Sequence, residues 1–163
     1  LLTRTGLLFV LLFSAGCYLR DIRWSPIRPP SREDAREYVV VTTGYCPCGV
    51  CCGWRRNWFG RAVIASGPNA GQGKAVGITA SGAPARHGTI AADTSIFPFG
   101  TIMHIPGYGY GRVEDRGGDI TGYHIDVYYS THSRAQQHGR YKERIRVWFP
   151  PGFTPPRAAP VTR

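Results

Sequence analysis

A cluster of carboxylates lies between Val113 and Asp126, in the sequence VEDRGGDITGYHID. The chain has ten acidic residues against twenty basic ones, and four of the ten fall in this stretch: Glu114, Asp115, Asp119 and Asp126. Neighbouring carboxyl groups can perform general acid and base chemistry once their surroundings separate their pKa values. Cleavage of a glycosidic bond is one such reaction, because the leaving oxygen needs a proton and the sugar needs charge stabilisation.

Asp126 is the strongest candidate for the acid. It lies in YHIDVYY, where aromatic and apolar residues alternate, and an Asp without a partner in an apolar strand costs stability. Partial burial would raise its pKa, and the negative charge of a nearby Asp115 would raise it further. A structural alternative stays open for the others. Asp beside Gly is common in turns, which could explain Asp115 and Asp119, and Asp93 could cap a helix or turn.

The segments that must position these residues are mostly short strands bounded by Gly and Pro. The predicted strands lie in YVVVTTGY (38–45), GTIMHIPGYG, GYGRVEDRGG, YHIDVYY and RIRVWF (144–149). STHSRAQQHGR (130–140) predicts a helix that is capped by Ser130 or Thr131 and ends at Gly139. Many short strands with Gly and Pro turns predict a mainly β fold, either a small barrel or a sandwich, with one or two short helices.

The first part of the sequence has the pattern of an export signal. Arg4 precedes an apolar run, 7–13, that is too short to span a bilayer, and SAGC (14–17) resembles a bacterial lipobox ending at Cys17. Plain secretion or an uncleaved anchor is the alternative. We expect a signal peptide at 1–16, lipidation at Cys17, a Pro- and Arg-rich linker at 17–37, a folded domain at 38–149 and a disordered Pro-rich tail at 150–163. The protein is then expected outside the cytoplasm of a bacterium, either in the periplasm or as an outer-membrane lipoprotein. In the second case its lipid anchor would attach it to the membrane.

The formal net charge of +10 comes from basic residues that are scattered along the chain. A nucleic-acid-binding domain would show a clustered basic patch and a docking motif, and neither is found. We therefore expect no nucleic-acid partner. A basic surface also suits an anionic polymer such as a cell-wall glycan.

The residues from Gly77 onward resemble the 3D domain, which is named for three aspartates. The motifs are GITASG, GTIAAD, FPFGTIMHIPGYGYGRVEDRGGDITGYHIDVYY and GRYKERIRVWF. The three aspartates would be Asp93, Asp115 and Asp126. Related domains occur in stationary-phase muralytic proteins and at the C-terminus of membrane-bound lytic transglycosylase A. The resemblance covers about 39–149 and implies a small double-psi β-barrel.

The resemblance also implies a reaction, the non-hydrolytic cleavage of peptidoglycan between MurNAc and GlcNAc to leave a 1,6-anhydro-MurNAc end. Asp126 would act as acid and then base, with Asp115 and Asp93 in support. Peptidoglycan glycan strands are the expected partner, and the chain is expected to be a monomer. Two alternatives stay open: a non-catalytic peptidoglycan-binding module, and a polysaccharide hydrolase with the same type of barrel.

Several further residues are expected to contact the substrate. Thr79 and Ser81 could hydrogen-bond a sugar or the aspartates, although a structural turn at Ser81 is an equal alternative. His124 would share a strand face with Asp126. The glycine pair Gly117 and Gly118 completes the set. The family often has a lysine where this chain has Thr121; if that lysine contacts the glycan or the transition state, activity or substrate preference would differ.

The sequence YCPCGVCCGW forms a cysteine-rich loop at 45–54, with Cys46, Cys48, Cys51 and Cys52 within seven residues. Outside the cytoplasm disulfides are favoured, although the adjacent Cys51 and Cys52 are poorly placed to bond each other. The spacing differs from the usual two separated zinc pairs, but four thiolates in a tight loop could hold one ion. Disulfides, a structural zinc and redox chemistry stay open. We assign the loop a stabilising role and expect no cofactor for the reaction.

The other ring side chains have weaker assignments. His87, His132 and His138 lack the spacing of metal ligands and are expected at the surface. Trp54 and Trp58 could stack on sugar rings, with packing as the alternative for at least one of them.

Overall fold

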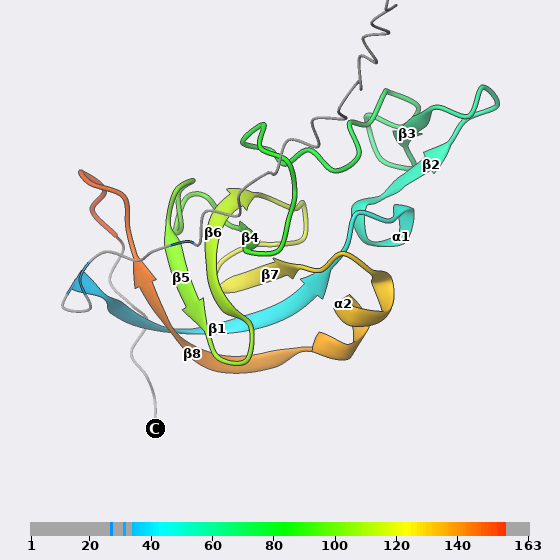
Figure 1. The fold of residues 1–163 in the computed structure, drawn as a ribbon. Helices are drawn as coiled ribbons and strands as arrows, with labels where there is room; N and C mark the ends of the chain where they lie inside the picture. Colours follow the sequence, from blue (N-terminus) through cyan, green and yellow to red (C-terminus); the bar gives the residue numbers. More distant parts are fainter. Residues whose placement is uncertain (1–26, 28–30, 32–33, 156–163) are drawn as a thin grey trace, which may run out of the picture.

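Figure 1 shows the computed structural model, which describes residues 27, 31 and 34–155. Six strands close a barrel in the order β1-β7-β4-β6-β5-β8. Their bounds are β1 Arg36–Tyr45, β4 Thr89–Ala92, β5 Ile102–Ile105, β6 Gly109–Asp115, β7 His124–Tyr128 and β8 Tyr141–Trp148. The predicted mainly β barrel is confirmed, and its double-psi connections stay a prediction. The expected signal peptide and Cys17 lie outside the described residues.

Strand β1 pairs with both β8 and β7. Its first part pairs antiparallel with β8, from Arg36 opposite Val147 to Thr42 opposite Tyr141. Its second part pairs parallel with β7, ending at Tyr45 opposite Tyr128. The long ladder with β8 explains why β1 begins at Arg36, two residues before the expected domain boundary.

The barrel interior is filled by residues at alternate strand positions, as the pleat of a strand requires. Thirteen buried residues form this core; eleven lie on the barrel strands, and Phe97 and Tyr108 come from the loops before and after β5. On β7 the inward residues are Ile125 and Val127, so Asp126 between them points to the outer face of the barrel. A second apolar cluster, Tyr45, Ala91 and Tyr128, lies on that outer face.

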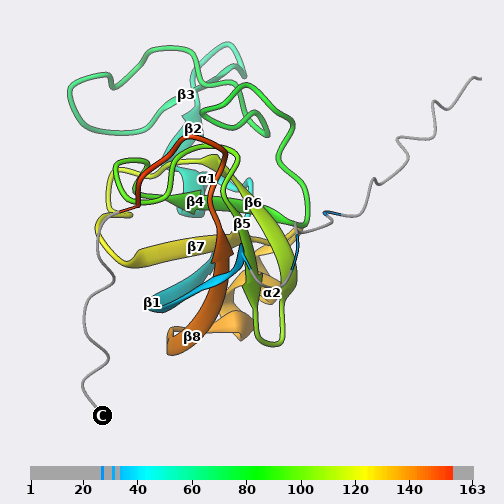
Figure 2. The ribbon, with the colours of Figure 1, turned by 90° about the vertical axis from the view of Figure 1, so that its left-hand side faces the viewer.

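The outer face is covered by the long connection between β1 and β4. This connection contains α1 (Gly49–Cys52) and a separate two-stranded sheet of β2 (Trp54–Arg56) and β3 (Ala62–Ile64). Figures 1 and 2 show β2 and β3 beyond the end of β1, away from the barrel. The sequence reading predicted no element here apart from the cysteine-rich loop.

The second helix, α2 (His132–His138), confirms the predicted helix with Thr131 as N-cap and Gly139 at its end. The Thr131 side chain accepts a hydrogen bond from the Arg134 amide, as an N-cap does. In the described part of the chain neither helix has the length and apolar character that a bilayer crossing needs.

Gly44 allows α2 to pack directly on β1. A Cβ atom at this position would lie 2.7 Å from the backbone oxygen of Ala135 and 3.0 Å from the Cβ atom of His138. We expect Gly44→Ala to lower the free energy of unfolding by about 1–3 kcal/mol, because the helix must shift. Urea denaturation measures this change. Gly73→Ala is the matched control, since a Cβ atom there meets nothing within 4 Å. Equal losses in the two variants would contradict the packing argument.

Candidate active site

Asp126 lies in the middle of β7 and is fixed by β1. It pairs in register with Thr43 on the parallel neighbour, and the Thr43 hydroxyl donates a hydrogen bond of 3.0 Å to Asp126 Oδ1. The same Thr43 oxygen lies 2.9 Å from Nε2 of His124, two residues along β7. His124 therefore shares a face with Asp126, as predicted, and reaches it through Thr43. Burial, followed by the charge of Arg140, lowers the pKa of His124, which favours the neutral ring at pH 7.

Asp115 ends β6 and is held by three hydrogen bonds. Its Oδ1 accepts from the amides of Ala80 and Arg116, each at 2.9 Å, and its Oδ2 accepts from the Tyr45 hydroxyl at 3.2 Å. Burial, followed by the Asp115 charge, raises the pKa of Tyr45, so this phenol remains a donor. Asp115 is therefore locked in place with its charge directed at the outer face.

A small residue separates the two aspartates. Ala91 on β4 pairs with Asp126 on one side and with Asp115 on the other, where an irregularity in the ladder shifts the register. The two backbones are thus two strand spacings apart, about 10 Å. Because Ala91 carries only a methyl group, the space between the two carboxyl groups stays open.

A cavity of about 690 Å³ opens above Ala91, and both Asp115 and Asp126 line it. The barrel supplies Tyr45 and Tyr128, the connection between β1 and β4 supplies Trp54 and residues 74–80, and the β6–β7 loop supplies residues 116–120. The volume is in the usual range for a ligand site. A long ligand could therefore contact both aspartates at once.

The surroundings of Asp126 raise its pKa to about 6. Burial is the main cause, the Thr43 hydrogen bond opposes it, and the negative charge of Asp115 adds to it. A carboxyl group with this pKa is partly protonated near neutral pH and can donate a proton and later take one back. The pair thus has the chemistry of one acid beside one fixed charge.

Asp93 is not brought to this pair. It follows β4 directly, its Oδ1 accepts from the amide and hydroxyl of Ser95, and its Oδ2 accepts from the Gly122 amide at 2.9 Å. The Ser95 hydroxyl, then the amides of Gly122 and Ser95, lower its pKa. Asp93 does not line the cavity. The geometry matches the turn-cap alternative and ties the β6–β7 loop to the end of β4.

The other two acidic residues of the cluster, Glu114 and Asp119, do not join the pair of Asp115 and Asp126. Glu114 is buried and engaged by other residues: Arg86 Nη2 lies 2.8 Å from its Oε1, and the Thr89 hydroxyl donates to its Oε2. Asp119 is exposed and lies on the cavity rim. Three of the four carboxylates that the sequence gathers therefore line the cavity, and two of them, Asp115 and Asp126, are register partners of Ala91.

The predicted substrate-contacting residues divide in the same way. Thr79, Gly117 and Gly118 line the cavity, whereas Ser81 and His124 do not. The Ser81 hydroxyl lies 3.0 Å from that of Thr79, and the Gly82 amide donates to the Thr79 carbonyl, which is the turn alternative. Trp54 lines the cavity, while Trp58 is 96% exposed at the tip between β2 and β3.

The four cysteines of the loop are all free thiols in the structure. Cys46 Sγ and Cys51 Sγ lie 3.8 Å apart, far longer than a disulfide bond of about 2.05 Å. The expected disulfides are therefore not formed here. The surface assignment of His132 is wrong, because its ring lies among three of the sulfurs. His132 is 80 or more positions away in the sequence, so motif spacing could not identify it.

Comparison with known proteins confirms the family resemblance. Residues 88–149 match the family model described as "3D domain". A putative cell wall shaping protein of Bacillus subtilis, YabE, is 36% identical over 58 residues, which are 36% of this chain and 14% of that protein. A cell wall-binding protein of the same organism, YocH, is 33% identical over 89 residues, which are 52% of this chain and 31% of that protein. The chain thus matches less than a third of either relative.

Similarity to solved structures is partial. MltA from E. coli aligns with 47% of this chain and 29% of its own, with a TM-score of 0.37 and 22% identity. E. coli MltA with bound chitohexaose aligns with 44% of this chain and 27% of its own, with a TM-score of 0.35 and 27% identity.

The raised pKa of Asp126 predicts a stability penalty at neutral pH. Between the unfolded pKa of about 3.9 and the folded pKa of about 6, the folded chain holds a proton that the unfolded chain has lost. Stability therefore falls as pH rises through this window and stays lower above it. We expect Asp126→Asn to raise the free energy of unfolding by up to about 3 kcal/mol at pH ~8 and by nothing below pH ~4. Urea denaturation across this range measures the difference, and lower stability of the variant at every pH would contradict it.

For Asp93 we expect the opposite dependence of stability on pH. Its pKa is lowered in the folded chain, so its contribution is present above the unfolded pKa and is lost as pH falls through the folded pKa. We expect Asp93→Asn to lower the free energy of unfolding by about 1 kcal/mol at pH ~7, with the difference from the native chain shrinking in acid. The same urea series measures it. Glu37→Gln is the control, since Glu37 forms an exposed ion pair with Arg144 and should change little.

Proposed function

We propose that this chain is a lytic transglycosylase that cleaves peptidoglycan glycan strands between MurNAc and GlcNAc. The observation that carries the proposal is the pair of carboxyl groups in the cavity, with Asp126 at a pKa of about 6 and Asp115 held as a neighbouring charge. The match to the 3D domain over 88–149 contains both residues.

The reaction uses one group as acid and base in turn. Protonated Asp126 gives its proton to the glycosidic oxygen as the bond from the MurNAc anomeric carbon to that oxygen breaks. The negative charge of Asp115 stabilises the positive charge that develops on the sugar. The C6 hydroxyl of the same MurNAc then bonds to the anomeric carbon, and the Asp126 carboxylate takes its proton. The product is a 1,6-anhydro ring, and the acid is restored without water.

The site has features that suit a glycan. Tyr45, Tyr128 and Trp54 present ring surfaces to the cavity, and Lys74 and Arg116 bring positive charge to it. The apolar C–H face of a sugar ring packs well on aromatic side chains, and the basic residues suit the carboxylates of the wall polymer. Two relatives bear cell-wall names, one as a shaping and one as a binding protein. We accordingly place the chain outside the cytoplasm, with peptidoglycan as its partner.

A second candidate function is binding without catalysis. The relative that aligns over 89 residues is named a cell wall-binding protein, and the chain spans 31% of it. In that case Asp115 and Asp126 would accept hydrogen bonds from sugar hydroxyls. The two candidates differ in whether the glycan is cut.

The test is a digest of purified sacculi with the full chain, followed by mass spectrometry of the released muropeptides. We expect products one water lighter than hydrolysis products. Asp126→Asn should lower the rate by about 10²–10⁴-fold, because it removes the acid and base. Since the protonated form is needed for the first step, the native rate should fall as pH rises above about 6.

Two variants complete the digest. Asp115→Asn should also slow release, since the compensating charge is lost, whereas Glu37→Gln removes an exposed carboxylate far from the cavity and should leave the rate unchanged. Products with a reducing end would replace the proposal with a hydrolase. Intact strands that retain bound protein would replace it with the binding module.

A further inference from the structure

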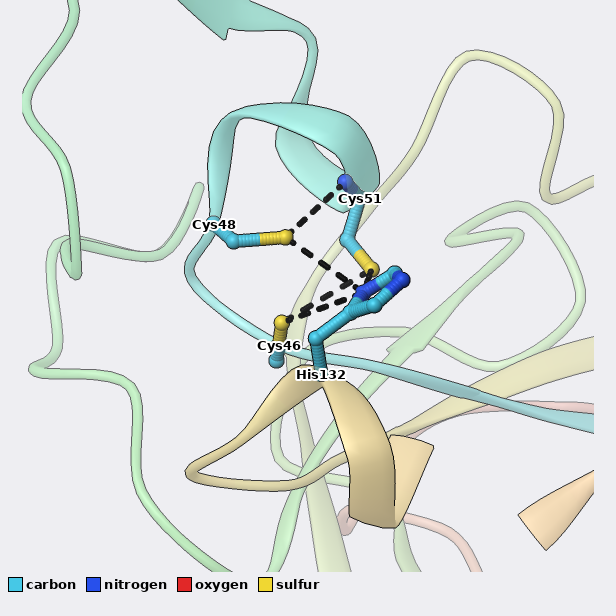
Figure 3. Close-up of side chains that lie close together, drawn as sticks. All are labelled: Cys46, Cys48, Cys51 and His132. Carbon is cyan, nitrogen blue, oxygen red and sulfur yellow. Dashed lines mark hydrogen bonds between the residues drawn. The ribbon is translucent and has the colours of Figure 1, made fainter. Parts of the chain in front are cut away.

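Three sulfurs and one ring nitrogen converge beside the cavity, on the side of α1 and α2. Cys46 follows β1, Cys48 and Cys51 belong to the α1 turn, and His132 is the first residue of α2 (Figure 3). Their ligand atoms all lie within 4.8 Å of one another. In Figure 3 the four side chains point toward one common centre.

Four of the six separations between the ligand atoms are close to the values of a tetrahedral metal site. His132 Nδ1 lies 3.9 Å from Cys46 Sγ, 3.5 Å from Cys48 Sγ and 3.4 Å from Cys51 Sγ. Cys46 Sγ and Cys51 Sγ are 3.8 Å apart. A tetrahedral zinc with Zn–S of about 2.3 Å and Zn–N of about 2.0–2.1 Å places two sulfurs about 3.8 Å apart and sulfur about 3.6 Å from nitrogen.

The loop is preorganised for this arrangement. Cys48 caps α1, with its sulfur accepting from the Cys51 amide at 3.5 Å, and an amide donor favours a thiolate. Trp54 Nε1 donates to the Pro47 carbonyl at 2.9 Å and closes the loop from outside. Gly49 is required, because a Cβ atom there would lie 2.4 Å from the Trp54 backbone oxygen.

We propose that Cys46, Cys48, Cys51 and His132 bind one structural zinc ion. Three thiolates and an imidazole are the soft and borderline ligands that zinc prefers. Four protein ligands complete the tetrahedron and leave no position for water or substrate, so the ion stabilises and does not catalyse. Cys52 is outside this group: its sulfur donates to the Cys46 carbonyl at 3.1 Å, and the residue lines the cavity.

The ion would link two chain segments that start from adjacent strands. β1 and β7 run parallel and end together at Tyr45 and Tyr128, so the residues that follow them lie at one edge of the barrel. Zinc binding at that edge would fasten α1, with its cavity-lining residues Val50 and Cys51, to the first turn of α2. This role does not depend on the proposed reaction.

The experiment measures zinc in the full chain, purified without added metal or reductant, by inductively coupled plasma mass spectrometry. We expect about one zinc per chain. Cys48→Ser and His132→Asn should each lose it, and Cys52→Ser should retain it as the matched control. Adding EDTA should lower the melting temperature of the native chain and of Cys52→Ser.

A second measurement covers the case that the ligand variants do not fold. The native chain, reduced and freed of metal, is titrated with Co²⁺, and strong visible absorption from tetrahedral cobalt with thiolate charge transfer is expected. Displacement by one equivalent of Zn²⁺ should abolish it. An intact mass lower by two hydrogens per cystine with no bound metal would overturn the proposal. So would a reduced chain that binds neither ion, or zinc loss in Cys52→Ser as complete as in Cys48→Ser.

Discussion

The pairing of β4 between β7 and β6 is the constraint on which the site depends. Ala91 is the register partner of both Asp126 and Asp115, so one central residue fixes how far apart the two carboxyl groups stand. The pleat places Ile90 and Ala92 in the barrel interior and leaves Ala91 on the outer face. The same alternation directs Ile125 and Val127 inward and Asp126 outward. The core and the cavity are therefore two faces of one set of strands, and neither can change register without the other.

The outer face is also where the electrostatics arise. A carboxyl group on an open strand would be solvated and would keep an ordinary pKa, but the connection between β1 and β4 covers Asp126 and withdraws it from water. Asp115 lies under the same cover, yet two amides and a phenol solvate its charge. Burial and unequal hydrogen bonding on one surface thus give the two carboxyl groups different surroundings.

The sequence predicted five of the six barrel strands and α2 because each carries a local signal, whereas β4 (Thr89–Ala92) was not among the predicted strands. Alternation marks RIRVWF and YHIDVYY, and Thr131 and Gly139 mark the ends of the helix. Asp126 was selected as the candidate acid for a local reason too, because it is a charged residue within an apolar strand. The role of Asp93 was harder to read, since a carboxylate that caps a turn and one that binds sugar have the same sequence context. Its bond to Gly122 spans 29 residues and appears only in three dimensions. The β2–β3 sheet was not predicted, because WRR and AVI are too short to show the alternation of polar and apolar residues that indicates a strand.

His132 shows what parallel pairing adds to a sequence. His132 lies too far along the chain from the three cysteines for a spacing rule to identify it. The parallel pairing of β1 and β7 nevertheless brings the residues after Tyr45 and those after Tyr128 to the same edge of the barrel. A histidine just beyond the second strand can therefore complete a cysteine cluster just beyond the first. That edge also holds Gly44, whose missing side chain lets α2 approach β1 closely enough for His132 to reach the loop. The parallel pairing of β1 and β7 thus determines three features: the packing of α2, the placement of the four ligand atoms and the wall of the cavity. The same pairing sets Thr43 opposite Asp126.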